Sequence, residues 1–173
     1  MSTRHRFYLI GQSCIGAGIA NAVINGLLGW GALRGLATFP MWRVPGVAAD
    51  LAGTAFGVTF GTCVVMAIQV PWDVRRGKIG PVALSPRVAS LIARFPRKTF
   101  RRALGLGLLS MPVFAFPVIV ALALLGASLM ESGRYVVLKA SFAAVEGAII
   151  TPFIVLAAVA DAARAARGNA LAS

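Results

Sequence analysis

The sequence predicts an all-α membrane protein in which four transmembrane helices form two hairpins. Hydrophobic residues make up 58% of the 173 residues, and the mean hydropathy is +0.83. A helix of roughly 20 apolar residues crosses a hydrocarbon core ~30 Å thick. Four stretches meet that length, at about residues 7–33, 48–71, 103–128 and 135–160. We therefore expect residues 1–173 to form a single four-helix transmembrane domain.

The first span, 7–33, begins like a secretory signal peptide. A short basic segment, Met1 to Arg6, precedes an apolar run, and Ala20-Asn21-Ala22 resembles a small-residue cleavage site. The apolar run continues past that point to Leu33. We therefore predict an uncleaved first transmembrane helix.

The second span, 48–71, ends at Pro71-Trp72 and leads into the longest connection, residues 72–102. Ser85-Pro86 is typical of a helix start. Apolar residues then follow at helical spacing as far as Phe95, with basic residues between them. This pattern predicts a short amphipathic helix in the lipid headgroup layer. The candidate headgroup contacts are Arg87, Arg94, Arg97 and Lys98. They are either a topology signal alone or a binding site for anionic lipid.

The third and fourth spans, 103–128 and 135–160, contain prolines. Proline removes a backbone donor and disturbs the preceding helical turn. Pro112 and Pro117 are expected to bend the third span, and Pro152 the fourth.

The distribution of basic residues predicts the orientation in the membrane. Thirteen of the 17 Lys and Arg residues lie in the N-terminal segment, the 72–102 connection and the C-terminal tail. Cytoplasmic loops carry an excess of such residues. Both termini and the long connection are therefore expected in the cytoplasm of a bacterial inner (plasma) membrane. The net charge of +12 then reflects topology, so we expect no binding of nucleic acid.

Two stripes of small residues predict close helix packing, because small residues let helices approach in lipid. The first span carries Gly18, Ala22 and Gly26, and the second carries Gly53, Gly57 and Gly61, each at four-residue spacing. The favoured arrangement packs this glycine zipper of one span against that of the other. The alternative is contact with a second protein chain.

Polar residues inside the spans mark the candidate functional site. At 1.5 Å per residue, Asn21 and Thr59 lie about 14 Å below the outer surface and Glu146 about 16 Å below it. Asn25 lies one turn from Asn21 on the same face. These residues are expected to form one polar layer near the middle of the bilayer. Asp50 and Lys139, nearer the outer ends, are expected to pair or to extend toward the interface.

Glu146 is the most informative residue, because an intramembrane carboxyl group costs at least ~2.5 kcal/mol to insert. One interpretation is a protonatable group that binds a proton or a cation. The other is a structural hydrogen bond that joins helices. For Asn21 and Asn25, a role in joining helices is favoured over ligand contact.

The sequence lacks the residues that several classes of protein need for their function. The only histidine is His5, so no His-based metal site or Ser-His-Asp set is expected within the membrane. No Walker or dinucleotide-binding motif occurs. Cys14 and Cys63 lie apart within different spans. We therefore expect a protein that is not an enzyme and has no cofactor and no metal site.

The chain resembles a group of uncharacterised bacterial four-span membrane proteins. The resemblance is carried by Ala20-Asn21-Ala22 with Ile24-Asn25-Gly26, by Ala49-Asp50-Leu51 with Thr54-Ala55-Phe56, and by Arg75-Arg76-Gly77-Lys78. It implies a bacterial inner-membrane setting and no particular activity.

Two functions remain open from the sequence. The first is a transporter-like or permeation protein, acting as a homo-oligomer, in which Glu146, Asn21, Asn25 and Thr59 bind a proton or another ligand. The alternative is a non-catalytic membrane subunit, assembly factor or anchor of a larger complex. Its small-residue stripes would then contact a membrane-protein partner.

Overall fold

The computed structural model describes residues 14–78, 90, 96 and 98–170, and the side chains of 163–170 are not described. Four helical segments in it are long and apolar enough to cross a membrane: Cys14–Leu33, Val47–Arg75, Thr99–Leu124 and Ser132–Ala162. Each overlaps one of the four predicted spans, so the prediction of four apolar membrane-length helices is confirmed. The predicted interfacial helix, with Arg87, Arg94 and Arg97, lies outside the described residues.

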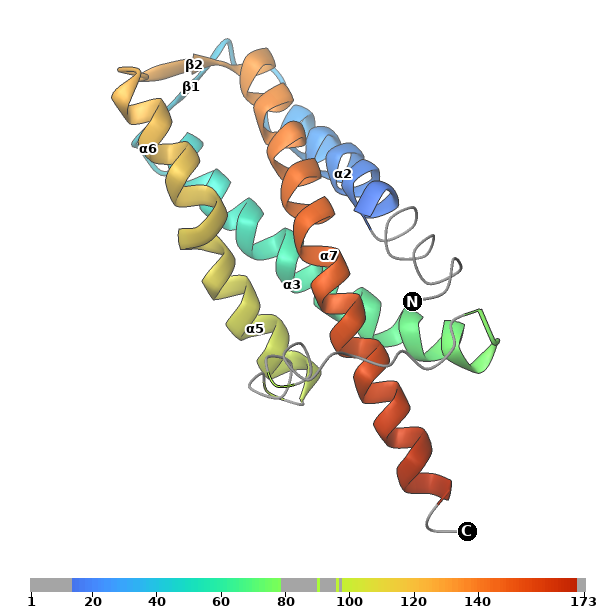
Figure 1. Ribbon diagram of the computed structural model, residues 1–173. Coiled ribbons are helices and arrows are strands. Elements are labelled where there is room, and N and C mark those ends of the chain that lie inside the picture. Colours follow the sequence, from blue (N-terminus) through green and yellow to red (C-terminus); the bar gives the residue numbers. More distant parts are fainter. Residues whose placement is uncertain (1–13, 79–89, 91–95, 97, 171–173) are drawn as a thin grey trace.

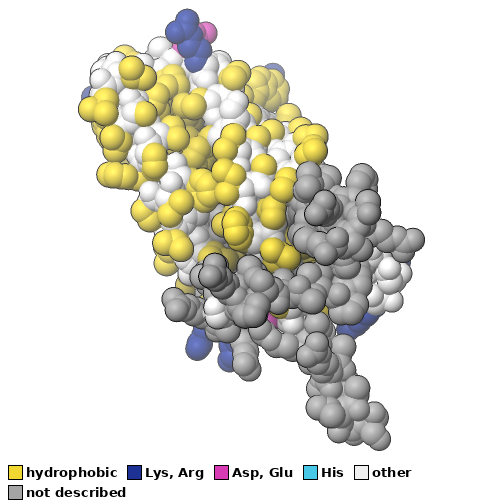
Figure 2. Space-filling view, viewed as in Figure 1, with side chains coloured by type: hydrophobic (Ala, Val, Ile, Leu, Met, Phe, Trp, Pro, Cys, Tyr) yellow, Lys and Arg dark blue, Asp and Glu magenta, His cyan; other side chains and the backbone are white. Residues whose placement is uncertain are grey.

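Helices and two short strands alternate along the described chain. In chain order they are α2 (Ala17–Leu33), β1 (Thr38–Pro40), α3 (Val47–Arg75), α5 (Thr99–Ser110), η2 (Met111–Ala115), α6 (Phe116–Leu124), β2 (Leu129–Glu131) and α7 (Ser132–Ala170). The helices lie along a common direction, and the two short strands meet at one end (Figure 1). Hydrophobic side chains cover the visible long side, and basic side chains gather at the ends (Figure 2).

The α2–α3 and α6–α7 connections pair with each other, which the sequence did not indicate. Strands β1 and β2 are antiparallel, with Phe39 opposite Met130. Phe39 is buried, and its ring centroid lies 5.1 Å from that of Tyr135 on α7. The sheet thereby joins the α2–α3 connection to the α6–α7 connection, beside a core that includes Leu51 and Phe142.

The third span is irregular at its centre. The α-helix α5 gives way at Met111 to the π-helical segment η2, which is followed by α6. Pro112 is the second residue of η2, and its missing N–H removes one bond of the regular ladder. Pro112 therefore coincides with the irregular turn. Pro152, in contrast, lies inside the single long helix α7.

The glycine stripe of the first span packs against α7, so the expected contact with the stripe of the second span is wrong. A Cβ atom added to Gly18 would lie 3.5 Å from Ala148 Cβ, and one added to Gly26 would lie 3.4 Å from Ala140 Cβ. Alanines at 140, 144 and 148 supply a smooth stripe of their own on α7. Small residues on both helices explain the close approach.

The stripe of the second span remains uncovered. A Cβ atom added to Gly53, Gly57 or Gly61 would meet no described atom within 4 Å. Helix α3 instead uses its other faces to pack against α7 and α5. Gly107 on α5 is closely covered by the ring of Phe56 on α3.

Candidate functional site

Glu146 lies in the packed interior between α7 and α3. Its side chain is fully buried, as is that of Thr59. The Thr59 hydroxyl donates a hydrogen bond of 2.8 Å to Glu146 Oε1. Glu146 Oε2 is buried and has no hydrogen-bond partner among the described residues. The structure therefore brings together two of the predicted site residues and leaves one carboxyl oxygen unsatisfied.

Ser110 adds a third polar side chain beside this carboxyl group. Its hydroxyl lies 2.8 Å from the carbonyl oxygen of Ala55 on α3 and 2.7 Å from that of Gly107. Ser110 is the last residue of α5, and the irregular segment η2 begins directly after it. Sequence reasoning missed Ser110, although its position just before Pro112 was a signal for an irregular turn.

Glu146 also differs from the other acidic residues in its charge environment. The chain has five acidic residues, and all five lie within the described ranges. Four form salt bridges: Asp50 with Lys139, Asp73 with Lys78, Glu131 with Arg134, and Asp161 with Arg102. Among the salt bridges of the described residues, none includes Glu146. Its carboxyl group is therefore the one that no basic side chain neutralises there.

Asn21 and Asn25 have no hydrogen bond to Glu146 among the described residues, so the predicted polar layer is hydrogen-bonded to Glu146 through Thr59 and not through these amides. Asn21 Nδ2 donates to the carbonyl oxygen of Ala17 at 2.9 Å, and Asn25 Nδ2 donates to that of Asn21 at 3.0 Å. Both amides thus bond to their own helix. The physical reason is that the carbonyl one turn earlier is always in reach, whereas Glu146 faces Thr59.

Asn21 instead packs against the backbone of α7 at Gly147. A Cβ atom added to Gly147 would lie 2.5 Å from Asn21 Nδ2 and 3.3 Å from the carbonyl oxygen of Ala17. Both distances are shorter than ordinary contact. Glycine at 147 therefore allows α2 to approach α7 beside Glu146.

Replacing Gly147 with Ala is expected to destabilise the α2–α7 contact by about 1 kcal/mol, the lower end of the cost of overpacking. The Asn21 side chain would have to leave its bond to Ala17. In a Gly147→Ala background, Asn21→Ala should therefore recover part of the loss. The thermal unfolding midpoints of the two single variants and the double variant in detergent measure this coupling. Additive losses would show that Asn21 is not the obstacle.

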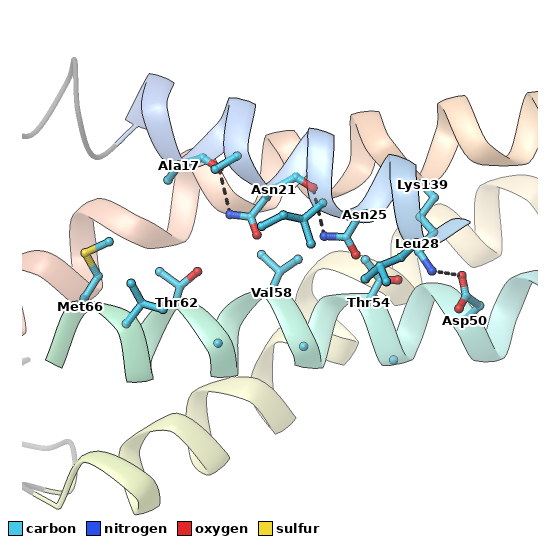
Figure 3. Close-up of a pocket in the computed structure, with 16 residues that line it drawn as sticks. Ala17, Asn21, Asn25, Leu28, Asp50, Thr54, Val58, Thr62, Met66 and Lys139 are labelled. Atoms are coloured by element: carbon cyan, nitrogen blue, oxygen red, sulfur yellow. Dashed lines mark hydrogen bonds and ion pairs between the residues drawn. The ribbon is translucent and has the colours of Figure 1, made fainter. Parts of the chain in front are cut away.

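A groove of about 550 Å³ runs between α2 and α3. Figure 3 shows it with Asn21 and Asn25 on one wall and Thr54, Val58 and Thr62 on the other. The uncovered glycine stripe of α3 forms part of the lining. From Asp50 to Met66, α3 lines the groove for about 24 Å at 1.5 Å per residue, a large part of a hydrocarbon core.

Two hydroxyl groups in the groove have spare hydrogen-bonding capacity. Thr54 is 6% exposed and Thr62 is 9% exposed. Neither has a hydrogen bond to any described residue. Each hydroxyl can donate one bond and accept others, and each Asn amide keeps its oxygen as an acceptor. The groove can therefore bind a molecule that carries both donors and acceptors.

An ion pair lines the end of the groove at which α3 begins. Lys139 Nζ lies 2.6 Å from Asp50 Oδ2, and the Tyr135 hydroxyl donates to the same oxygen. The Lys139 side chain is only 9% exposed, against 37% for Asp50. The pairing was one of the two expectations for these residues. Their place in the lining, with Asp50 two turns from Gly57 on α3, was not foreseen.

The opposite end of the bundle carries a second set of charged residues. Arg102 is buried, pairs with Asp161 of α7 and donates from Nε to the carbonyl oxygen of Pro96 at 3.1 Å. The Arg76 guanidinium lies 3.4 Å from the ring centroid of Trp72. Lys98, the one described candidate for lipid headgroup contact, is exposed.

The atoms near Glu146 that could bind a metal ion are hydroxyl and carbonyl oxygens. No group of three or more His, Cys, Asp or Glu side chains that could hold a metal ion occurs in the described part of the chain. The surroundings of Glu146 thus differ from a transition-metal site, which uses imidazole, thiolate or several carboxylates.

A comparison of the chain with protein-family models, with curated proteins and with solved structures finds no match in any of the three.

Proposed function

We propose that the protein is a small, non-enzymatic permeation protein of the bacterial inner membrane, with both termini in the cytoplasm, and that its solute path is the α2–α3 groove. The groove carries the proposal, because it follows a large part of the membrane-spanning length of α3 and places the polar side chains of Asn21, Asn25, Thr54 and Thr62 along an otherwise apolar lining. Among the described lining residues the charged ones are Asp50 and Lys139, which neutralise each other. Such a lining suits small uncharged solutes that both donate and accept hydrogen bonds.

The groove would be completed by a second copy of the chain. The four helices leave the path open on one side, where Gly53 and Gly57 have no covering atoms among the described residues. In this arrangement a homodimer encloses the path, and the basic 72–102 connection contacts anionic lipid at the cytoplasmic surface.

The permeation proposal is tested with glycerol as the probe. Vesicles that contain the purified protein should swell faster in a glycerol gradient than protein-free vesicles. Gly57→Leu should lower the rate to that of protein-free vesicles, because the added side chain fills the groove. Gly105→Leu is the matched control, since Gly105 is exposed on α5 outside the groove. Equal swelling with and without protein would contradict the proposal.

The second candidate, a non-catalytic membrane subunit or anchor, is supported by the same uncovered stripe. Gly53, Gly57 and Gly61 could contact a helix of another membrane protein instead of lining a water-filled path. Gly57→Cys in a chain without Cys14 and Cys63 separates the two. A water-soluble thiol reagent should modify this cysteine in membranes if the groove is a path. If the reagent does not modify this cysteine, and other proteins co-purify in stoichiometric amounts in mild detergent, the protein is a subunit of a larger complex.

A further inference from the structure

We propose that Glu146, together with Thr59, Ser110 and the carbonyl oxygen of Ala55, binds a monovalent metal cation, with Na⁺ as the fitting ion. We call these residues the Glu146 cluster. The proposal rests on observations separate from the groove, since neither Glu146 nor Thr59 lines it. The site would therefore exist whether or not the groove conducts a solute.

The first argument is the balance of charge. A buried carboxylate is costly unless a positive charge or several hydrogen bonds compensate it. The exposed fraction of Glu146 is 0%, and its hydrogen bond among the described residues comes from the Thr59 hydroxyl. The other four acidic residues are all in salt bridges. A bound cation would supply the missing charge.

The second argument is the set of oxygens. Glu146 Oε2 is buried without a partner among the described residues, and Thr59 Oγ1 lies 2.8 Å from Oε1. Ser110 Oγ lies 2.8 Å from the Ala55 carbonyl oxygen. A serine hydroxyl has one proton and keeps lone pairs that can face a cation. Carboxylate, hydroxyl and carbonyl oxygens are hard ligands of the kind that alkali and alkaline-earth cations select.

The third argument concerns the charge and size of the ion. One carboxylate and three neutral oxygens give a neutral complex with a monovalent cation. A divalent ion would leave a net positive charge inside the bilayer, which is expensive. The cluster is buried, with Thr59 0% and Ser110 3% exposed, and an ion bound there needs room inside the helix bundle. This favours Na⁺ over the larger K⁺.

The third span can also adjust around such an ion. Ser110 directly precedes η2, where the α-helical ladder is interrupted. π-helical turns inside α-helices are frequent at functional sites. Because Ser110 borders this turn, whereas Glu146 and Thr59 belong to regular helices, the Ser110 oxygen can move most easily toward the ion.

The test is Na⁺-dependent stabilisation of the purified full chain in mild detergent. Thermal unfolding is followed in NaCl and in choline chloride at equal ionic strength. A ligand that binds only the folded state multiplies the folded-to-unfolded ratio by one plus its concentration over Kd. At Na⁺ tenfold above Kd, the ratio should rise about tenfold. Binding of radioactive Na⁺ to the same sample should give one ion per chain, and K⁺ should compete poorly.

Matched variants distinguish the site from a general salt effect. Glu146→Gln should unfold at the same temperature in both salts and bind no radioactive Na⁺. Glu131→Gln, the same change at an exposed residue, should keep the full response. If Glu146→Gln does not fold, Thr59→Val keeps the carboxyl group and should weaken Na⁺ binding about tenfold, as loss of one ligand worth about 1.4 kcal/mol would. A wild-type chain that neither binds Na⁺ nor responds to it would overturn the proposal, as would an unchanged response in Glu146→Gln.

Discussion

Replacing Asp50 with Ala should lower the free energy of unfolding by about 2–3 kcal/mol, between the cost of breaking an exposed ion pair and that of breaking a fully buried one. The change would leave the Lys139 ammonium group, whose side chain is 9% exposed, without its carboxylate. It would also remove the acceptor of the Tyr135 hydroxyl. Unfolding by detergent titration in mixed micelles measures the loss, with the thermal midpoint as a second readout.

The two members of this pair should differ in cost. Lys139→Met is expected to cost clearly less, because Asp50 would keep the Tyr135 hydroxyl and its side chain is 37% exposed. The double variant should be more stable than Asp50→Ala alone, since the uncompensated ammonium is gone. Strictly additive losses would show that the pair is not coupled.

An exposed pair at the start of α7 supplies the control for these variants. Glu131 and Arg134 lie 3.1 Å apart, with side chains 63% and 83% exposed. Surface ion pairs contribute about 0–1 kcal/mol. Glu131→Ala should therefore change the free energy of unfolding by no more than this amount. A loss as large as that of Asp50→Ala would mean that burial does not determine the cost.

The membrane-length helices could be predicted from the sequence because the signal is local. Each apolar run is continuous, so hydropathy alone locates it. For the second span, the predicted range 48–71 compares with Val47–Arg75 in the structure. The pairing of β1 with β2 could not be predicted, because it joins three-residue segments about 90 positions apart. Neither segment has a sequence pattern that indicates which segment it pairs with.

The helix that faces each small-residue stripe could not be predicted from the sequence either. Four-residue spacing of glycine and alanine indicates a smooth helix face, but it does not identify the facing helix. Gly18 and Gly26 meet a stripe of alanines that includes Ala140 and Ala148 on α7. Alanines are so common in apolar helices that this stripe did not stand out. The glycines of α3, which did stand out, border the groove.

The sequence predicted which residues belong to the candidate site, but not all of the hydrogen bonds between them. Counting 1.5 Å per residue along each helix placed Glu146 and Thr59 at a similar depth in the membrane. In the structure the two residues are hydrogen-bonded. Depth does not define rotation about the helix axis, so it could not separate Asn21 from Glu146. Asn21 reaches a carbonyl of its own helix, and such local bonds compete with contacts between helices.

Replacing Gly107 with Ala should destabilise the fold, whereas the same change at Gly105, two residues away on α5, should be neutral or stabilising. A Cβ atom at Gly107 would lie 2.9 Å from two atoms of the Phe56 ring and 3.3 Å from the Phe56 carbonyl oxygen. At Gly105 it would meet no described atom within 4 Å. In a helix interior, Ala is more favourable than Gly by about 0.5–1 kcal/mol, and this gain applies to both positions.

Comparing Gly107→Ala with Gly105→Ala separates the effect of packing on stability from the effect of helix propensity. Overpacking costs about 1–3 kcal/mol, so Gly107→Ala should be less stable than Gly105→Ala by at least about 1 kcal/mol. Phe56→Leu should recover part of the loss in the Gly107→Ala background, because it removes the ring that the new methyl group meets. Thermal unfolding midpoints of the three variants in one detergent give the comparison. Equal midpoints for the two alanine variants would mean that α5 does not approach α3 at Gly107. That result would also remove the support for placing Ser110, one turn further along α5, beside the Ala55 carbonyl oxygen and Glu146.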